Sequence, residues 1–183
     1  MPENKIIVIG SYTPKSTDVY FFDNNIWMYI FCPIANFQKD KRQKIYSKFF
    51  ENILSRKLPI FVNSLVLSEF ANRYLKLDFD LCNRNSKTYY SNFKKDYVRS
   101  KQYQKTVTEI KMYLKQIIKC SQKCSDEFNS INLDEVFALF EKIGFNDSYY
   151  LHLANQKKWV IVSDDSDFTG SKVPNLGLTI LTR

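Results

Sequence analysis

Six carboxylates stand at positions along this 183-residue chain where a folded sheet could bring them together: Asp23, Glu69, Asp147, Asp164, Asp165 and Asp167. Carboxylates that lie close together repel one another, and the repulsion raises their pKa values unless a cation neutralises them. Hard oxygen ligands of this kind select Mg²⁺ or Mn²⁺, which bind a few protein carboxylates together with water and substrate phosphate. Such a site hydrolyses phosphodiesters, because the cation activates water and stabilises the leaving oxygen.

Short apolar runs that alternate with helical patterns predict the scaffold for these side chains. Strands are expected at residues 6–9, 18–22, 59–62, 159–162 and 178–181. Uniformly apolar strands that alternate with helices are typical of a parallel sheet covered on both faces. We therefore expect one α/β domain over residues 1–183, with an N-terminal extension at 1–16 and a basic helical insertion at 84–130.

Helices are expected at 24–32, at 37–56, from Ser64 onward, across most of 84–123, at 132–143 and at 147–158. The helix at 132–143 has Asn132 and Glu135 in the arrangement of a capping box and Gly144 at its end. Its expected core face consists of Leu133, Val136, Phe137 and Phe140.

The predicted strands place most of the carboxylates at one edge of the sheet. Asp23 follows the strand at 18–22, the group Asp164–Asp167 follows 159–162, and Glu69 lies early in the helix after 59–62. Ligands of open α/β sheets bind beyond the carboxyl ends of the strands, so this edge is the expected site. Asp147 precedes its strand, and only the fold decides whether it converges. Taken singly, each residue also fits a helix terminus, a turn or a solvated surface.

The net charge of +8 arises from 27 lysines and arginines against 19 aspartates and glutamates, and it is concentrated in two segments. Residues 39–57 hold seven basic and two acidic side chains, and residues 84–123 hold eleven and two. Residues 124–183 are acidic, with nine carboxylates against five basic groups. Basic helices of this kind are either solvated outer faces or contacts for an anionic partner.

Composition excludes several classes of protein. Apolar residues at 44% and aromatic residues at 16% are too many for a disordered chain. No apolar run approaches the ~18 residues of a membrane span, and the N-terminus lacks the pattern of a signal peptide. The four cysteines form no CxxC pair, so we expect reduced thiols and a cytoplasmic location. The lone histidine, His152, is expected to be a packing or surface residue.

Four segments resemble the ordered motifs of PIN-domain nucleases. The first runs from Val19 through Asp23 and Asn25 to Trp27, and the second from Leu65 to Glu69 and Phe70. The third is the stretch 146–154, in which Asp147 opens a helix, and the fourth is the strand at 159–162 running into Ser-Asp-Asp-Ser-Asp-Phe. All four occur in the family's order and span nearly the whole chain.

The resemblance implies a three-layer α/β/α fold with a central, mostly parallel sheet and a helical insertion between the second and third acidic motifs. It also implies a Mg²⁺- or Mn²⁺-dependent ribonuclease site built from Asp23, Glu69, Asp147 and Asp165. Asp167 would support the metal, whereas Asp164 matches a variable position. Asn25 and Ser163 would orient the carboxylates.

The implied substrate is RNA. Tyrosines 89, 90, 97 and 103 could stack on unpaired bases, which would suit single-stranded RNA. The alternative is that these tyrosines belong to the core or to a partner interface. Many PIN proteins are VapC-like toxins held inactive by an antitoxin, which makes an antitoxin the expected protein partner; pairing with a second copy of the chain is left open. The candidate phosphate contacts are Lys41, Arg42, Lys44, Arg99, Lys111, Lys115 and Lys119.

Two other functions remain as alternatives. A catalytically silent PIN-like module would bind RNA or a partner protein without cleaving anything. A receiver-like signalling domain also gathers carboxylates at strand ends, but it needs a phosphoacceptor aspartate after a middle strand and a lysine after the last one. Neither of these residues is evident in the sequence.

Overall fold

Strand β2 (Tyr20–Phe22) lies inside a parallel six-stranded sheet, between β5 (Val160–Val162) and β3 (Ile60–Val62). The computed structural model describes residues 3–34, 41–85, 89–170 and 173–183. The strand order is β1–β6–β5–β2–β3–β4, with β1 at Lys5–Val8, β4 at Gln122–Lys123 and β6 at Thr179–Thr182. Because the strands are parallel, their carboxyl ends meet at one edge.

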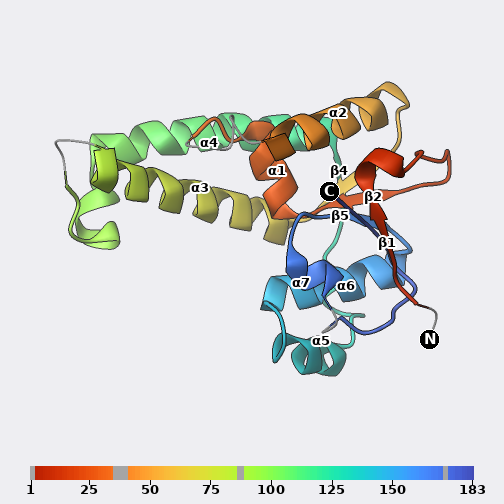
Figure 1. The fold of residues 1–183 in the computed structure, drawn as a ribbon. Coiled ribbons are helices and arrows are strands. Elements are labelled where there is room, and N and C mark those ends of the chain that lie inside the picture. The colour runs from red at the N-terminus through yellow and green to blue at the C-terminus, as the bar shows by residue number, and fades with distance from the viewer. Residues whose placement is uncertain (1–2, 35–40, 86–88, 171–172) are drawn as a thin grey trace.

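The side chains of β2 alternate between two helical layers. Phe22 contacts Trp27 of α1 (Asn24–Phe31) and Phe50 of α2 (Lys41–Ser55). Phe21 points to the opposite face, where its ring lies 5.1 Å from that of Tyr150 in α6 (Phe145–Lys157). Figure 1 shows α1 and α2 on one side of the sheet and α5 (Leu133–Phe140) and α6 on the other. The chain therefore has the three-layer α/β/α architecture that was predicted.

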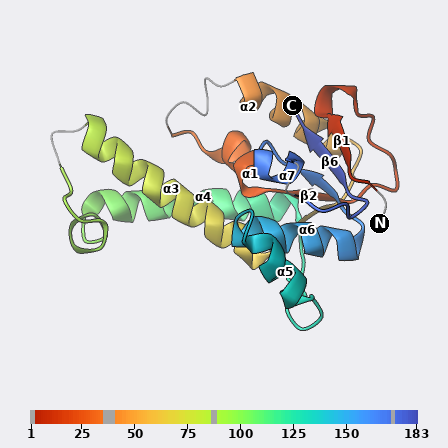
Figure 2. The ribbon, with the colours of Figure 1, turned by 60° about the horizontal axis from the view of Figure 1, so that its bottom comes forward.

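Two long helices form an arm that projects from the sheet in both views (Figures 1 and 2). They are α3 (Ser64–Asn85) and α4 (Lys101–Cys120), and a single π-helical turn, η3 (Phe93–Tyr97), lies near the tip of the arm. Asp78 is buried in the arm and accepts hydrogen bonds from Tyr97 Oη at 2.6 Å, from Thr106 Oγ1 at 2.8 Å and from Gln102 Nε2 at 3.0 Å. This carboxylate thereby ties the tip to both helices.

All five predicted strands are present, and the short strand β4 is an addition within the segment expected to be mostly helical. Its two residues, Gln122 and Lys123, pair with Phe61 and Val62 of β3. The sequence shows no apolar alternation there, because both side chains of this edge strand are exposed. The helix that begins at Ser64 also runs to Asn85, so half of the arm precedes the expected insertion at 84–130.

The predicted core face of α5 is correct at Val136 and wrong at Phe137 and Phe140. Val136 and Leu139 are buried, whereas Phe137 and Phe140 are 51% and 52% exposed. The short helix carries two apolar stripes offset by one residue, and both satisfy helical spacing. The buried stripe is the one that continues to Ile143, which is also buried.

A short 3-10 turn, η1 (Ile9–Ser11), follows β1. Within the described residues, no helix is long and apolar enough to span a membrane.

Candidate functional site

The centre of the candidate site is Asp23, which follows β2 at the carboxyl edge of the sheet and is only 4% exposed. Because Phe22 is in register with Val162 of β5, the next residues, Asp23 and Ser163, lie side by side. The Asp23 carboxylate caps α1, with Oδ1 accepting from the backbone N–H of Asn24 at 2.6 Å. Its Oδ2 accepts from Ser163 Oγ at 2.9 Å and from Asn25 Nδ2.

Asn25 and Ser163, the two residues expected to orient carboxylates, join the first motif to the fourth. Asn25 Nδ2 lies 3.1 Å from Ser163 Oγ, and Asn25 Oδ1 accepts from the backbone N–H of Asp164 at 3.2 Å. Ser163 Oγ also accepts from the backbone N–H of Asp165 at 3.1 Å. The loop that carries the last aspartates is therefore fixed relative to Asp23.

Glu69 reaches the site from the second turn of α3, and its carboxylate accepts hydrogen bonds from three side chains that the sequence did not predict as partners. Its Oε1 accepts from Asn24 Nδ2 at 3.4 Å. Its Oε2 accepts from Asn146 Nδ2 at 3.1 Å and from Tyr150 Oη at 3.2 Å. The glutamate thus links α1, α3 and α6. Asn24 and Asn146 both lie beside a predicted acidic residue in sequence, which is the only local signal that they carried.

Asp147, whose convergence the sequence left open, joins the same electrostatic group from the first turn of α6. Its pKa is raised to about 7, first by burial and then by the charges of Asp165, Glu69 and Asp167. The pKa of Asp23 is raised to about 8 by burial and by the charges of Glu69 and Asp147, against the lowering effect of its hydrogen bonds. Burial and the neighbouring carboxylates thus disfavour the charged forms of Asp23 and Asp147.

Asp165 and Asp167 lie at the start of the short helix α7 (Ser166–Thr169). Asp165 is exposed and caps this helix, with Oδ1 accepting from the backbone N–H of Asp167 at 3.0 Å. Asp164 turns away from the group and contacts Tyr46 Oη at 2.9 Å and two arginines. This orientation agrees with its assignment to the variable position of the motif.

The carboxylate oxygens of this site are the donors that a hard divalent cation prefers. Among the residues that the structure describes, no group of three or more His, Cys, Asp or Glu side chains is arranged to hold a metal ion. Mg²⁺ commonly binds one or two carboxylates and completes its shell with water and substrate phosphate. A cation held by Asp23 with Asp147 or Asp165 would fit that pattern and would relieve the repulsion between them.

The basic candidates are distributed over three places. Lys41, Arg42 and Lys44 lie in the first turn of α2, where Arg42 pairs with Asp164 at 3.3 Å. Arg99 is exposed near the tip of the arm. A ridge of exposed side chains runs along α4, on the side away from the buried Ile110 and Ile117. The residues of this ridge are Lys111, Lys115 and Lys119.

The arm tyrosines divide between core and surface. Tyr97 is fully buried, and its ring contacts those of Tyr90 at 5.4 Å and Tyr103 at 5.6 Å. Stacking of Tyr97 on an RNA base is therefore ruled out, and this residue follows the core alternative. Tyr89 is exposed.

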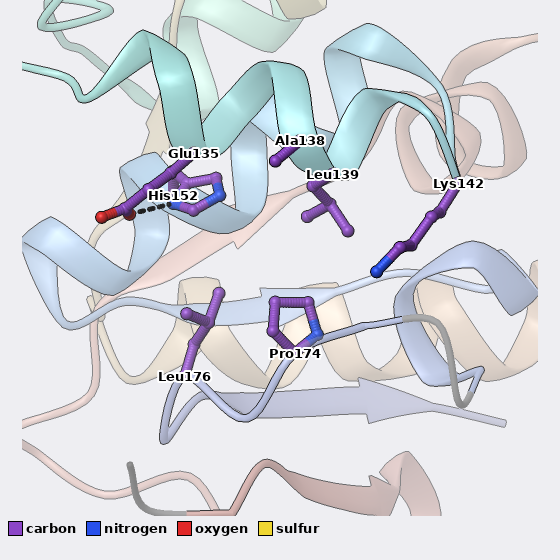
Figure 3. Close-up of a pocket in the computed structure, with 7 residues that line it drawn as sticks. All are labelled: Glu135, Ala138, Leu139, Lys142, His152, Pro174 and Leu176. Carbon is purple, nitrogen blue, oxygen red and sulfur yellow. Dashed lines mark ion pairs between the residues drawn. The ribbon is translucent and has the colours of Figure 1, made fainter.

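His152 lies outside the acidic group, at a cavity of about 290 Å³ between α5, α6 and the segment 174–176 (Figure 3). Its Nδ1 is 3.3 Å from Glu135 Oε2, and burial lowers its pKa against the effect of that carboxylate. The ring is buried, as expected for a packing histidine.

Comparisons with known proteins support the fold. No protein-family model matches the sequence, and no curated protein matches it either. Among solved structures, VapBC2 from Rickettsia felis, bound to a DNA fragment from the promoter of its genes, is similar, with a TM-score of 0.53 and 14% sequence identity. The match covers 89% of this chain and 98% of the other. Similarity at this identity supports a PIN-like fold and leaves the activity to the chemistry of the site.

Proposed function

We propose that this chain is a metal-dependent endoribonuclease that cleaves RNA phosphodiesters at the carboxyl edge of its sheet. The observation that carries the proposal is the raised pKa of both Asp23 and Asp147, caused by burial and by neighbouring carboxylates. A protein gains no stability from such repulsion. Perturbed carboxylates gathered at the ligand-binding edge of an α/β sheet are instead typical of a functional site.

The proposed cofactor is Mg²⁺ or Mn²⁺, held by Asp23, Asp147 and Asp165 with Asp167 in support. When bound, the cation would polarise the scissile phosphate and lower the pKa of a water molecule. Glu69 keeps its position through hydrogen bonds from two residues of α6, and Asp23 through one from Ser163, which follows β5. Among the described residues, no hydrogen bond restrains the Asp147 carboxylate, so this side chain is free to turn toward a cation.

The proposed substrate is single-stranded RNA, and the proposed setting is a toxin–antitoxin pair. The exposed lysines of α2 and α4 supply cations for phosphate contacts, whereas the acidic edge alone would repel RNA. The similarity to VapBC2 supports an antitoxin as the protein partner of this chain.

A second candidate function is a catalytically silent module that binds RNA or protein. The observation in its favour is that no ready-made group of three metal ligands exists among the described residues. The two candidates predict the same RNA binding and differ in cleavage and in the response to metal.

The decisive experiment is incubation of the purified protein with labelled single-stranded RNA and Mn²⁺, with and without a chelator. We expect cleavage that the chelator abolishes and that is lost in Asp23→Ala and Asp147→Ala. Asp134→Asn, which changes an exposed carboxylate on α5, is the matched control and should cleave like the wild type. Binding without cleavage, together with a melting temperature that Mn²⁺ does not change, would favour the silent module.

A further inference from the structure

Two arginines converge on one buried carboxylate directly beside the acidic site. The Asp164 side chain is only 5% exposed, and its oxygens lie 3.3 Å from Arg42 Nη1 and 3.1 Å from Arg183 Nε. Two phenol groups complete the contacts, Tyr46 Oη at 2.9 Å and Tyr29 Oη at 3.2 Å. Two guanidinium groups thus lie against the Asp164 side chain.

The cluster holds both guanidinium groups in place while leaving them partly open to solvent. The Tyr29 and Tyr46 rings are stacked with centroids 5.6 Å apart, and the Arg42 guanidinium lies 5.1 Å from the centroid of Tyr29. The Arg42 side chain is 35% exposed and that of Arg183 is 57% exposed. A guanidinium group has five N–H donors, so one bond to a carboxylate leaves Arg183 with donors for another anion.

The position of the cluster links it to the proposed reaction. Asp164 is the neighbour of Asp165 in the chain, and its backbone N–H bonds to Asn25, which also holds Asp23. Arg183 follows β6, the strand beside β5, and therefore lies at the same carboxyl edge of the sheet. A polyanion that enters the acidic edge is repelled by the carboxylates there, so it needs a cation close by.

We infer that Arg183 and Arg42 form a phosphate-binding subsite on the β6 side of the acidic group, oriented by Asp164. Its ligand is a backbone phosphate of the RNA strand near the scissile bond. This inference rests on the proposed ribonuclease function and names the residues that fix the strand there. The lysine ridge lies on α4, which leads into the edge strand β4, whereas Arg183 follows β6, on the other side of β2 and β5 in the strand order.

The first test measures how strongly RNA binding depends on salt. Affinity for a short fluorescein-labelled single-stranded RNA is measured by anisotropy over a series of KCl concentrations, in an Asp147→Asn background to suppress cleavage. Each phosphate contact to single-stranded RNA contributes about 0.7 to the slope of log K against log salt. Arg183→Gln should lower the slope by about that amount and weaken binding roughly three- to tenfold at low salt.

Two variants separate charge from folding. Arg183→Lys should keep the slope, because the charge remains. Arg56→Gln is the matched control: this exposed arginine bonds to Asn52 and Pro14 near the opposite edge of the sheet, and its loss should leave the slope unchanged. If Arg183→Gln lowers the melting temperature but not the slope, the arginine only neutralises Asp164 and the inference is overturned.

The second test locates the phosphate. A set of RNAs, each with one uncharged methylphosphonate linkage, should bind the Asp147→Asn protein more weakly when that linkage lies at the contacted position. When Arg183→Gln is added to the Asp147→Asn protein, that RNA should bind no more weakly than the unmodified RNA does. A methylphosphonate effect of equal size in the single and the double variant would overturn the inference. If the wild type cleaves RNA but Arg183→Gln leaves the salt slope unchanged, only this subsite is overturned. If Arg183→Gln lowers the salt slope but the wild type does not cleave RNA, the ribonuclease activity is overturned and the phosphate contact stands.

Discussion

The hydroxyl group of Ser163 donates a hydrogen bond of 2.9 Å to the carboxylate of Asp23, although 140 positions separate the two residues in the sequence. The same oxygen accepts from the backbone N–H of Asp165 at 3.1 Å. One hydroxyl therefore sets the distance between the first and the last acidic motif. This relationship makes Ser163 a positioning residue, because it acts on the site only through its neighbours.

Replacement of Ser163 by alanine should slow RNA cleavage by about 10- to 100-fold, the usual effect of losing a residue that orients metal ligands. The change also removes the acceptor of the Asp165 backbone N–H and one of the three donors to the Asp23 carboxylate, at a cost of about 1–2 kcal/mol. The rate is measured with labelled RNA and Mn²⁺, and the stability by thermal melting. Ser55→Ala removes a hydroxyl that bonds only within α2 and should change neither. A Ser163→Ala enzyme with the wild-type rate would contradict the positioning role.

Tyr150→Phe tests how Glu69 is held. The phenol is one of two donors to Glu69 Oε2, and Asn146 Nδ2 remains in place when it is removed. We expect a rate loss of less than about tenfold and a destabilisation near 1 kcal/mol, since a single hydrogen bond is lost. Glu69→Gln should instead abolish cleavage. If both variants lose activity completely, Tyr150 has a direct role in the reaction that its contact with Glu69 does not explain.

The sequence predicted those parts of the fold that leave a local pattern. Each core strand is a continuous apolar run, because helices cover both faces of the sheet, and all five predicted strands are present. β4 was missed because two exposed polar residues at an edge carry no such pattern. The error at Phe137 and Phe140 of α5 has a similar cause: both apolar stripes of this helix satisfy helical spacing, and only packing selects between them.

The residues of the candidate site were likewise predictable only where the sequence carries a local pattern. Asp23 and the aspartates after β5 were placed correctly at the sheet edge, because they directly follow strands. The contacts of Glu69 with Asn24, Asn146 and Tyr150 depend on how three helices pack, which periodicity does not reveal. Arg183 was overlooked for the same reason, since only the pairing of β6 with β5 brings it to Asp164.

Asp78→Ala should loosen the tip of the arm without unfolding the sheet. The substitution removes the acceptor for Tyr97, Gln102 and Thr106, and two of these partners, Tyr97 and Thr106, are themselves buried. Thr106 Oγ1 keeps the Gln102 carbonyl as an acceptor, so the main cost is the loss of the acceptor of the buried Tyr97 hydroxyl, about 1–3 kcal/mol, and this loss is local. Hydrogen exchange should accelerate at residues 93–106 and stay unchanged in β2 and β5. Asp80→Ala is the control, because its pair with Lys76 at 3.8 Å is a weak surface contact. Faster exchange throughout the sheet would show that the arm is not an independent unit.

Asp147→Asn should stabilise the metal-free protein, and the gain should depend on pH. In the folded wild type the pKa of Asp147 is about 7, against about 3.9 for an unperturbed aspartate. The folded state therefore holds a proton that the unfolded state has released, so wild-type stability falls as pH rises from about 4 to about 7 and then levels off. An asparagine carries no charge to repel Glu69 and Asp165, so the variant escapes this loss.

The difference between the two melting temperatures should accordingly be small near pH 4 and reach its full size above about pH 7. After allowance for the partial exposure of Asp147, we expect about 1–2 kcal/mol, or roughly 3–6 °C for a chain of this size. Mn²⁺ should reverse the order, because a cation that binds only the folded state stabilises the wild type through the carboxylate that the variant lacks. A difference that is independent of pH would show that Asp147 does not repel its neighbours, and a difference that Mn²⁺ leaves unchanged would show that Asp147 does not bind the cation.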